Sequence, residues 1–166
     1  MAESSEKKIE QNIILQNQFK SGADWFFWIA GLSLINSLIV LAGANWSFIV
    51  GLGATQVIDG FAIDAAREYG FAGKAGGFIF DCVVAGVFVL FGVFARKKQD
   101  WAFIAGMTLY FLDALLFLMV QDWLSIGFHA FALVSIFSGF KAKQSLSAAE
   151  IVPAAASQPP GQGEKE

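Results

Sequence analysis

The stretch WAFIAGMTLYFLDALLFLMV, residues 101–120, holds a single charged residue, Asp113, among apolar and aromatic ones. A helix needs about 20 predominantly apolar residues to cross the hydrocarbon core of a bilayer. The stretch therefore predicts a membrane-spanning helix with a carboxylate inside it. An aspartate at such a position costs roughly 2.5–3.5 kcal/mol on insertion scales, so its side chain is expected to face the interior of a bundle or a water-filled cavity.

The whole chain has the composition of an integral membrane protein. Of its 166 residues, 56% are hydrophobic and 15% are charged, whereas soluble domains average about 25% charged residues. Four further apolar stretches lie at residues 25–43, 46–66, 77–95 and 124–140. The net charge of -3 gives no reason to expect a nucleic-acid partner. Cys82 is the only cysteine, which excludes an intrachain disulfide and a cysteine-rich metal site.

The second stretch, residues 46–66, is the most polar of the five, and the basic residues decide how to interpret it. If all five stretches cross the membrane, Lys and Arg near the span ends divide five to five. If residues 46–66 enter and return, or lie in the interface, only Arg67 and Lys74 are on one side. The other side then has eight: Lys7, Lys8, Lys20, Arg96, Lys97, Lys98, Lys141 and Lys143.

Cytoplasmic loops carry the excess of Lys and Arg. The charge pattern therefore favours four spans in a cytoplasmic membrane, with both termini in the cytoplasm. Five spans remain the alternative, because residues 46–66 are long enough to cross. The predicted fold class is an all-α integral membrane protein, a small bundle of four or five transmembrane helices with one polar re-entrant or interfacial segment.

The bundle is expected to occupy residues 23–141, between two flanking segments. Residues 1–22 have isoleucines at roughly helical spacing, which predicts a cytoplasmic amphipathic helix on the membrane surface, with a solvated helix as the alternative. Residues 142–166 are rich in Ala, Gln, Ser and Pro with few large apolar residues. Such composition predicts a disordered tail.

Two apolar segments resemble each other and indicate an internal repeat. DWFFWIAGLSLINSLIVLAGANW, residues 24–46, and DWAFIAGMTLYFLDALLFLMVQDW, residues 100–123, share an opening DW, an IAG triplet and a closing NW or DW. Chance similarity between apolar segments is the alternative. The alignment places Asn36 opposite Asp113, and binding sites of transporters with internal repeats lie where the repeats meet.

Asp113, His129 and Asn36 form the predicted centre of a functional site, with Tyr110 as a further candidate. Asp113 and His129 lie about 13 Å and 9 Å from the turn at residues 121–123, measured along their helices, so they could meet across the hairpin. The functional hypothesis is a pair that carries a proton or binds a small cation. The alternative is a hydrogen-bonded clamp between helices.

The polar residues of the second and third stretches are further candidates. In a re-entrant segment, Gln56 and Asp59 would face a water-filled vestibule and could attract cations. Asp64 lies three residues before Arg67 and is expected to form an ion pair with it on the helix surface. Asp81 is close to the start of its stretch and is expected at the membrane interface. Asp64 and Asp81 are therefore secondary candidates.

Several classes of enzyme are disfavoured by what the sequence lacks. A lone histidine cannot build a His-rich zinc site, and GxSxG, Walker, dinucleotide-binding and haem-attachment motifs are absent. No catalytic residue, metal or cofactor is predicted. The leading hypothesis is a membrane protein that binds or translocates a proton, a small cation or a proton-coupled substrate. The alternatives are a non-catalytic accessory or scaffold subunit and a lipid-modifying enzyme. The expected partners are the lipid bilayer and either further copies of the chain or a larger membrane complex.

Overall fold

The structure, a computed structural model, describes residues 2–43 and 51–156. These residues form helices and turns and contain no strand. The helices are, in chain order, α1 (Ala2–Leu41), α2 (Gly53–Tyr69), α3 (Phe71–Arg96), α4 (Asp100–Met119) and α5 (Trp123–Ala156). The predicted all-α fold class is confirmed.

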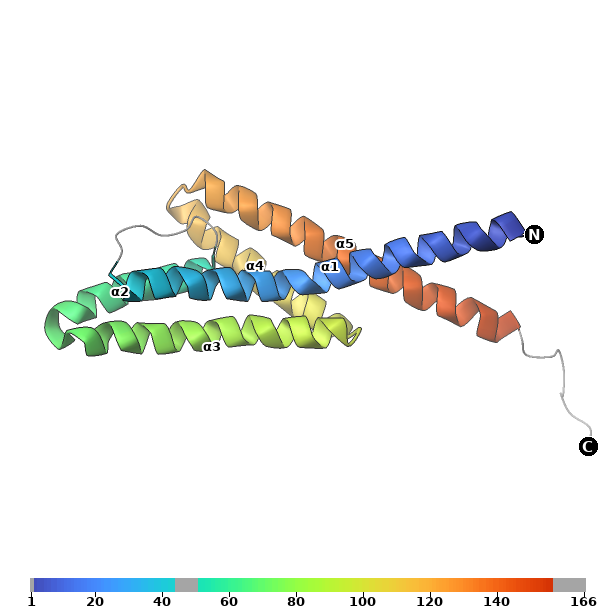
Figure 1. Cartoon of the computed structure of the whole chain (residues 1–166). Coiled ribbons are helices and arrows are strands. Elements are labelled where there is room, and N and C mark those ends of the chain that lie inside the picture. Colours follow the sequence, from blue (N-terminus) through green and yellow to red (C-terminus); the bar gives the residue numbers. More distant parts are fainter. Residues whose placement is uncertain (1, 44–50, 157–166) are drawn as a thin grey trace, which may run out of the picture.

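Four helices, α1, α3, α4 and α5, contain apolar runs long enough to cross a membrane. Successive long helices run in opposite directions, so α1 and α4 leave the end of the molecule that carries both termini, and α3 and α5 return to it (Figure 1). The shorter and more polar α2 is not among these four. Of the two predicted topologies, the structure therefore supports four spans with one additional segment.

Helix α2 begins inside the bundle. Gly51 packs against Ser33 of α1, and the backbone N–H of Leu52 donates a hydrogen bond to Ser33 Oγ over 2.8 Å. Ser33 precedes the end of α1 at Leu41 by eight residues, or about 12 Å of helix. From there α2 runs outward and turns into α3 at Gly70, whose φ of 60° favours glycine (Figure 1). Helix α2 is therefore the predicted re-entrant segment.

Small residues and aromatic rings hold the bundle together. α1 and α5 cross where Gly22 meets Gly139, and a Cβ atom on either glycine would clash with the backbone of the other helix. Further along α1, the ring of Phe26 lies 6.1 Å from the rings of Phe91 on α3 and Phe103 on α4, measured between centroids. Because these rings are buried, the centre of the bundle is filled by side chains.

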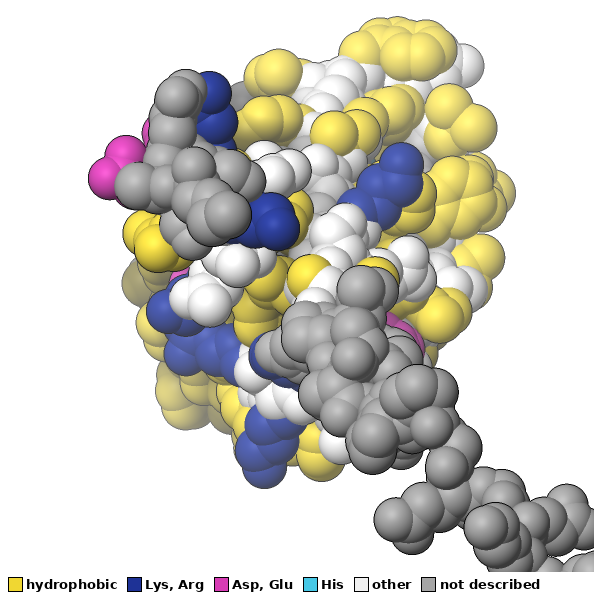
Figure 2. Space-filling view, turned by 90° about the vertical axis from the view of Figure 1, so that its right-hand side faces the viewer, with side chains coloured by type: hydrophobic (Ala, Val, Ile, Leu, Met, Phe, Trp, Pro, Cys, Tyr) yellow, Lys and Arg dark blue, Asp and Glu magenta, His cyan; other side chains and the backbone are white. Residues whose placement is uncertain are grey.

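The outward faces of the helices are largely apolar. Large side chains such as Phe61, Ile79 and Phe131 are more than half exposed, and apolar groups border the end of the molecule that Figure 2 shows. In water such a surface would be unfavourable, whereas hydrocarbon solvates it without cost. These faces are expected to contact lipid.

Both terminal helices are longer than predicted. α1 is continuous from Ala2, so residues 1–22 form no separate helix, although Ile9, Ile13 and Ile14 are exposed on it. The predicted disorder of residues 142–166 is wrong for residues 142–156, which continue α5. Residues 157–166 lie outside the described part of the chain.

The physical reason for both differences is the same. Ala, Glu, Lys and Gln have high helix propensity, and extending an existing helix avoids the cost of nucleating a new one. Tertiary packing adds to this on α5, where Ala142 and Leu146 are buried in the core cluster. Composition alone therefore underestimated how far each span continues as a helix.

Basic residues gather at the end of the molecule that carries both termini, as Figure 2 shows. Two ion pairs join helices there, Arg96 to Asp24 at 2.7 Å and Lys143 to Asp100 at 2.6 Å. Arg67 lies near the α2–α3 turn at the opposite end. The distribution of charge between the two ends thus follows the four-span topology.

Candidate functional site

Asp113 and His129 meet across the α4–α5 hairpin. His129 Nε2 lies 3.0 Å from Asp113 Oδ2, and the two side chains are 1% and 6% exposed. The helices place them at similar depth because the turn between α4 and α5 is short. The structure thus brings together the two residues that the hairpin geometry predicted as neighbours.

The same carboxylate also binds the beginning of α2. The backbone N–H of Gly53 donates to Asp113 Oδ2 over 2.7 Å, and that of Ala54 donates to Oδ1 over 2.8 Å. The first N–H groups of a helix have no partner within the helix, and the helix dipole makes this end attract negative charge. Asp113 therefore caps α2 from another helix. This role was not predicted, because main-chain donors leave no signature in the sequence.

Glycine at position 53 makes the close approach possible. A Cβ atom on Gly53 would lie 2.9 Å from the ring of Phe117 and 3.3 Å from Leu116 Cβ, both on α4. The first of these distances is shorter than a normal van der Waals contact. An alanine would therefore push the start of α2 away from α4, and with it the two N–H groups that Asp113 holds.

The hydrogen bonds of His129 fix where its first proton lies. His129 Nδ1 is 2.8 Å from the carbonyl oxygen of Ser125, and a carbonyl can only accept, so Nδ1 carries hydrogen. The contact between Nε2 and Asp113 Oδ2 then needs one more proton, which belongs either to the imidazole or to the carboxyl group. In both cases the pair is neutral overall. A pair of this kind can stay buried without a further counter-charge.

Aromatic rings enclose the imidazole. Tyr110 stacks on His129 with a centroid distance of 4.3 Å and an interplanar angle of 17°, and the Phe117 ring lies 4.9 Å away. Tyr110 is fully buried, and within the described residues its hydroxyl group has no hydrogen-bond partner. The predicted candidate Tyr110 is thus part of the same cluster, through its ring.

Asn36 approaches the site from α1. Its side chain is buried, and Nδ2 would lie 3.7 Å from a Cβ atom on Gly51, two residues before the start of α2. Asn36 and Asp113, which the internal repeat aligned, therefore both face the segment from Gly51 to Ala54. This arrangement agrees with the parallel course of α1 and α4 in Figure 1.

The remaining acidic candidates lie on α2 and α3. Asp64 forms the expected exposed ion pair with Arg67, at 3.7 Å. Asp81, which the sequence predicted at the membrane interface, is fully buried within the bundle. Because α3 begins at Phe71, Asp81 lies ten residues, or about 15 Å, inside the helix.

Asp59 is buried, whereas the sequence predicted that it would face a water-filled vestibule. Its residue is 6% exposed, and it lies between α2 and α3 close to Asp81, while Gln56 is half-buried. Ala62 of α2 and Gly77 of α3 approach so closely that a side chain on the glycine would not fit. Small residues thus bring the two helices together and exclude the space that the prediction required.

An apolar cavity of about 390 Å³ adjoins Asp113. Apart from the carboxylate, its walls are apolar side chains of α2, α3 and α4: Leu52, Ala54, Val84, Val87, Phe88, Leu109, Leu112 and Leu116. Such a lining suits a lipid chain or another apolar group. The carboxylate of Asp113, which caps α2, is therefore the only polar side chain among the described residues that line this cavity.

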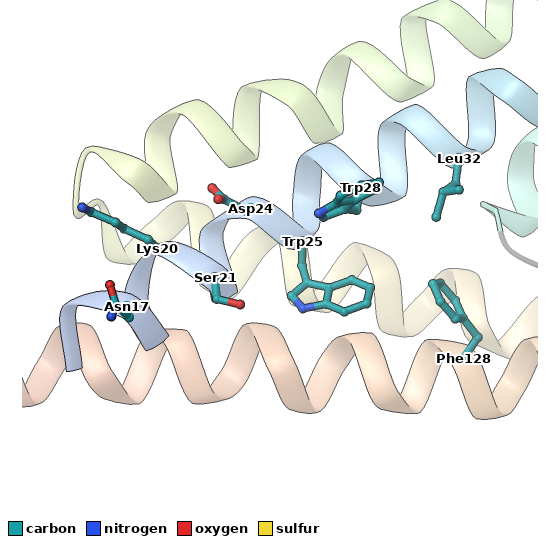
Figure 3. A pocket seen from close by; sticks show the side chains of 8 residues that line it. All are labelled: Asn17, Lys20, Ser21, Asp24, Trp25, Trp28, Leu32 and Phe128. Carbon is teal, nitrogen blue, oxygen red and sulfur yellow. The ribbon is translucent and has the colours of Figure 1, made fainter. Parts of the chain in front are cut away.

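A larger groove of about 530 Å³ lies elsewhere, between α1 and α5 (Figure 3). It is lined by Asn17, Lys20, Ser21, Asp24, Trp25, Trp28, Leu32 and Phe128, none of which is a predicted site residue. The Trp25 ring points toward α5 and contacts Phe128 at 6.0 Å between centroids. The groove follows the helix surface and is separate from the Asp113 cluster.

The part of the chain that the structure describes contains no group of three His, Cys, Asp or Glu side chains able to hold a metal ion. The groups that the Asp113 cluster offers are a carboxylate, an imidazole and the N-terminus of α2. Comparisons with protein-family models, curated proteins and solved structures find no match, so the function has to be inferred from this geometry.

Proposed function

We propose that the protein binds and transfers a proton, or a small cation coupled to it, at the Asp113–His129 pair within the membrane. One observation supports this more than any other. The carboxylate that holds His129 also holds the first two N–H groups of the re-entrant helix α2. Proton binding and the position of α2 are therefore linked through one side chain.

The link follows from counting protons at the pair. With one proton shared, Asp113 accepts hydrogen bonds from α2 and remains bonded to His129. If that proton leaves, an imidazole lone pair faces a carboxylate and their hydrogen bond is lost. If a second proton arrives, the carboxyl group becomes neutral and attracts the helix N-terminus less strongly. Only the second change weakens the attachment of α2, because loss of the proton leaves a full negative charge that still accepts hydrogen bonds from the N–H groups of Gly53 and Ala54.

The arrangement of helices around the pair resembles one that is found in many membrane transporters. In those proteins, interrupted helices place their N-termini near the membrane midplane and direct them at anionic groups. α2 begins inside the bundle and is attached there by Asp113 and by the hydroxyl group of Ser33. A helix held by so few polar contacts is a suitable moving element.

The orientation belongs to the same proposal. The excess of basic residues around the termini supports a cytoplasmic location for that end, by the rule that Lys and Arg stay inside. Asp113 precedes the end of α4 at Met119 by six residues, about 9 Å, so the pair lies nearer the opposite side. Because rings fill the centre of one bundle, a continuous water path would require assembly of several copies or another membrane subunit.

The test is proton flux into liposomes that contain the full-length chain. Wild type is compared with Asp113→Asn, which keeps the shape but removes titration, and with Asp64→Asn, a matched control at an exposed acidic residue. We expect flux in wild type and the control and its loss in Asp113→Asn. Absence of flux from wild type would refute the proposal, and so would full flux in Asp113→Asn.

A scaffold role is the second candidate, and one observation favours it. Asp113 is buried and makes three hydrogen bonds, two of them accepted from backbone N–H groups, as a purely structural clamp would. In that case Asp113→Asn lowers stability, and wild type transfers no protons. Because Asp113→Asn should lower stability under either function, the presence or absence of proton flux in wild-type liposomes is what separates the two.

A further inference from the structure

A second acidic cluster lies further along α2 from its N-terminus, away from His129. Asp59 on α2 and Asp81 on α3 interact with each other, and both interact with Ser37 on α1. Their residues are 6%, 0% and 1% exposed. Three helices thus direct two carboxyl groups and a hydroxyl group into one buried point.

Within residues 2–43 and 51–156, no basic side chain forms an ion pair with this cluster. The charged residues nearest to it in sequence are Asp64 and Arg67 on α2 and Lys74 on α3. Arg67 forms its ion pair with Asp64 at the surface, and Lys74 is seven residues, about 10 Å of helix, before Asp81. α1 has no charged residue from 25 to 41, and the acidic group of α4, Asp113, is held by α2 and His129. Ion pairing therefore does not account for the two carboxyl groups.

The oxygen atoms of the cluster also lack donors. Among the described residues, no well-aligned hydrogen bond reaches either oxygen of Asp81, Oδ2 of Asp59 or Oγ of Ser37. Buried polar atoms in proteins are nearly always hydrogen-bonded. The buried hydroxyl group of Ser37 comes from a third helix and faces the same point, with no well-aligned hydrogen bond of its own. Each of these oxygen atoms could therefore bind a cation or accept a hydrogen bond.

We infer that Asp59 and Asp81 share a proton across the α2–α3 interface, with Ser37 as the third partner, and so form a second proton-binding site. Two adjacent carboxylates away from water cannot both stay ionised, whereas a carboxyl group facing a carboxylate forms a strong hydrogen bond. A metal ion fits less well. Ca²⁺ takes about six to eight oxygen ligands, more than these three side chains supply.

The second site deepens the proposed function and rests on it in one respect, the movement of α2. Asp59 follows Ala54 by five residues, so the two sites are about 8 Å apart along the same helix. Thr55 and the half-buried Gln56 lie between them. With the proton present, α2 stays against α3. Without it, two negative charges face each other across the α2–α3 interface, and α2 is repelled.

The test is infrared spectroscopy of the full chain in lipid nanodiscs near neutral pH. A protonated carboxyl group has a carbonyl band separate from that of carboxylates, and the band shifts in heavy water. We expect a band in wild type that is absent from the double variant Asp59→Asn/Asp81→Asn and unchanged in the exposed control Asp64→Asn. Asparagine keeps the size of the side chain and removes the unpaired charge, so the double variant should fold.

The outcomes separate this site from the Asp113 site. The band should persist in Asp113→Asn even if that variant loses proton flux, and it should persist if wild type shows no flux at all. Identical spectra of wild type and the double variant would overturn the inference. So would loss of the band on adding NaCl or CaCl₂ to a metal-free sample, because a metal ion would then be the ligand. If the double variant does not fold, aspartate isotopically labelled at the side-chain carboxyl carbon must shift the band of wild type, and an unshifted band would also overturn the inference.

Discussion

The backbone N–H of Gly53 donates a hydrogen bond to Asp113 over 2.7 Å, although sixty positions separate the two residues in the sequence. This bond joins the start of a re-entrant helix to a membrane span, six residues before that span ends. It explains why the apolar stretch at 101–120 contains an aspartate, because the buried carboxylate replaces the partner that the helix end lacks.

Gly53→Ala should lower the free energy of unfolding by about 1–3 kcal/mol, the usual cost of overpacking. The added Cβ atom would lie 2.9 Å from the Phe117 ring and would displace the capped end of α2. The matched control is Gly60→Ala on the same helix, where nothing lies within 4 Å of the new atom. The control should be neutral or stabilising by up to about 1 kcal/mol. Unfolding in mixed micelles measures both, and equal effects would contradict the predicted contact.

Asp113→Ala should cost about 3–5 kcal/mol, because it leaves His129 and two backbone donors unpaired inside the bundle. Asp113→Asn should cost less, since its carbonyl oxygen still accepts while its NH₂ group faces a donor. The same unfolding assay should rank wild type, Asp113→Asn and Asp113→Ala in order of decreasing stability. An alanine variant as stable as wild type would show that Asp113 does not hold α2.

Tyr110→Phe should leave the stability unchanged or raise it by up to about 1 kcal/mol. The Tyr110 hydroxyl group is buried, and the described residues give it no hydrogen-bond partner, so removing it removes a desolvation cost. The stacking on His129 depends on the ring, which phenylalanine keeps. Thermal unfolding is the measurement, with the exposed Tyr69→Phe as control. A loss of more than about 1 kcal/mol would mean that the hydroxyl group is bonded in the folded protein.

Asp122 should make the α4–α5 turn sensitive to acid. It caps α5, with its Oδ2 accepting from the Ser125 hydroxyl group at 2.6 Å and its Oδ1 accepting from the Ser125 backbone N–H at 3.2 Å. These bonds hold the pKa of Asp122 below its ordinary value. A lowered pKa in the folded state means that the carboxylate stabilises the fold above the pKa of the unfolded chain, about 3.9. That contribution is lost as the pH falls through the lower folded value.

Asp122→Ala should therefore cost about 0.5–2 kcal/mol near neutral pH, as for other N-caps. The difference from wild type should shrink toward zero as the pH falls below about 4. Unfolding curves at a series of pH values test this. A difference that does not depend on pH would show that the charge of Asp122 is not involved.

The sequence was sufficient to predict features that depend on hydropathy and helical spacing. Apolar length and the count of Lys and Arg indicated four spans with one segment that does not cross. The spacing of Asp113 and His129 around a short turn predicted that the pair could meet. Each of these predictions depends on distances within one helix or one hairpin, which the helical rise fixes.

Features that depend on the position of α2 could not be predicted. Its N-terminus binds Asp113 through main-chain donors that any residue except proline could supply. The meeting of Asp59 and Asp81 requires the turn at Gly70 and a start of α3 at Phe71, six residues before the apolar stretch. The length of α5 was underestimated because helix propensity continues where hydropathy ends.

The crossing of α1 and α5 at Gly22 and Gly139 acts as a pivot. Because neither residue has a side chain, the two backbones are in direct contact, and a change in the angle between the helices must turn about this point. Ser33 on α1 and His129 on α5, which contact the site, are on one side of the pivot. The long ends toward Ala2 and Ala156 are on the other (Figure 1). A change in the angle between α1 and α5 that keeps this contact would therefore alter two distances together. One is the separation of the terminal arms, and the other is the spacing of Ser33 and His129 at the buried site.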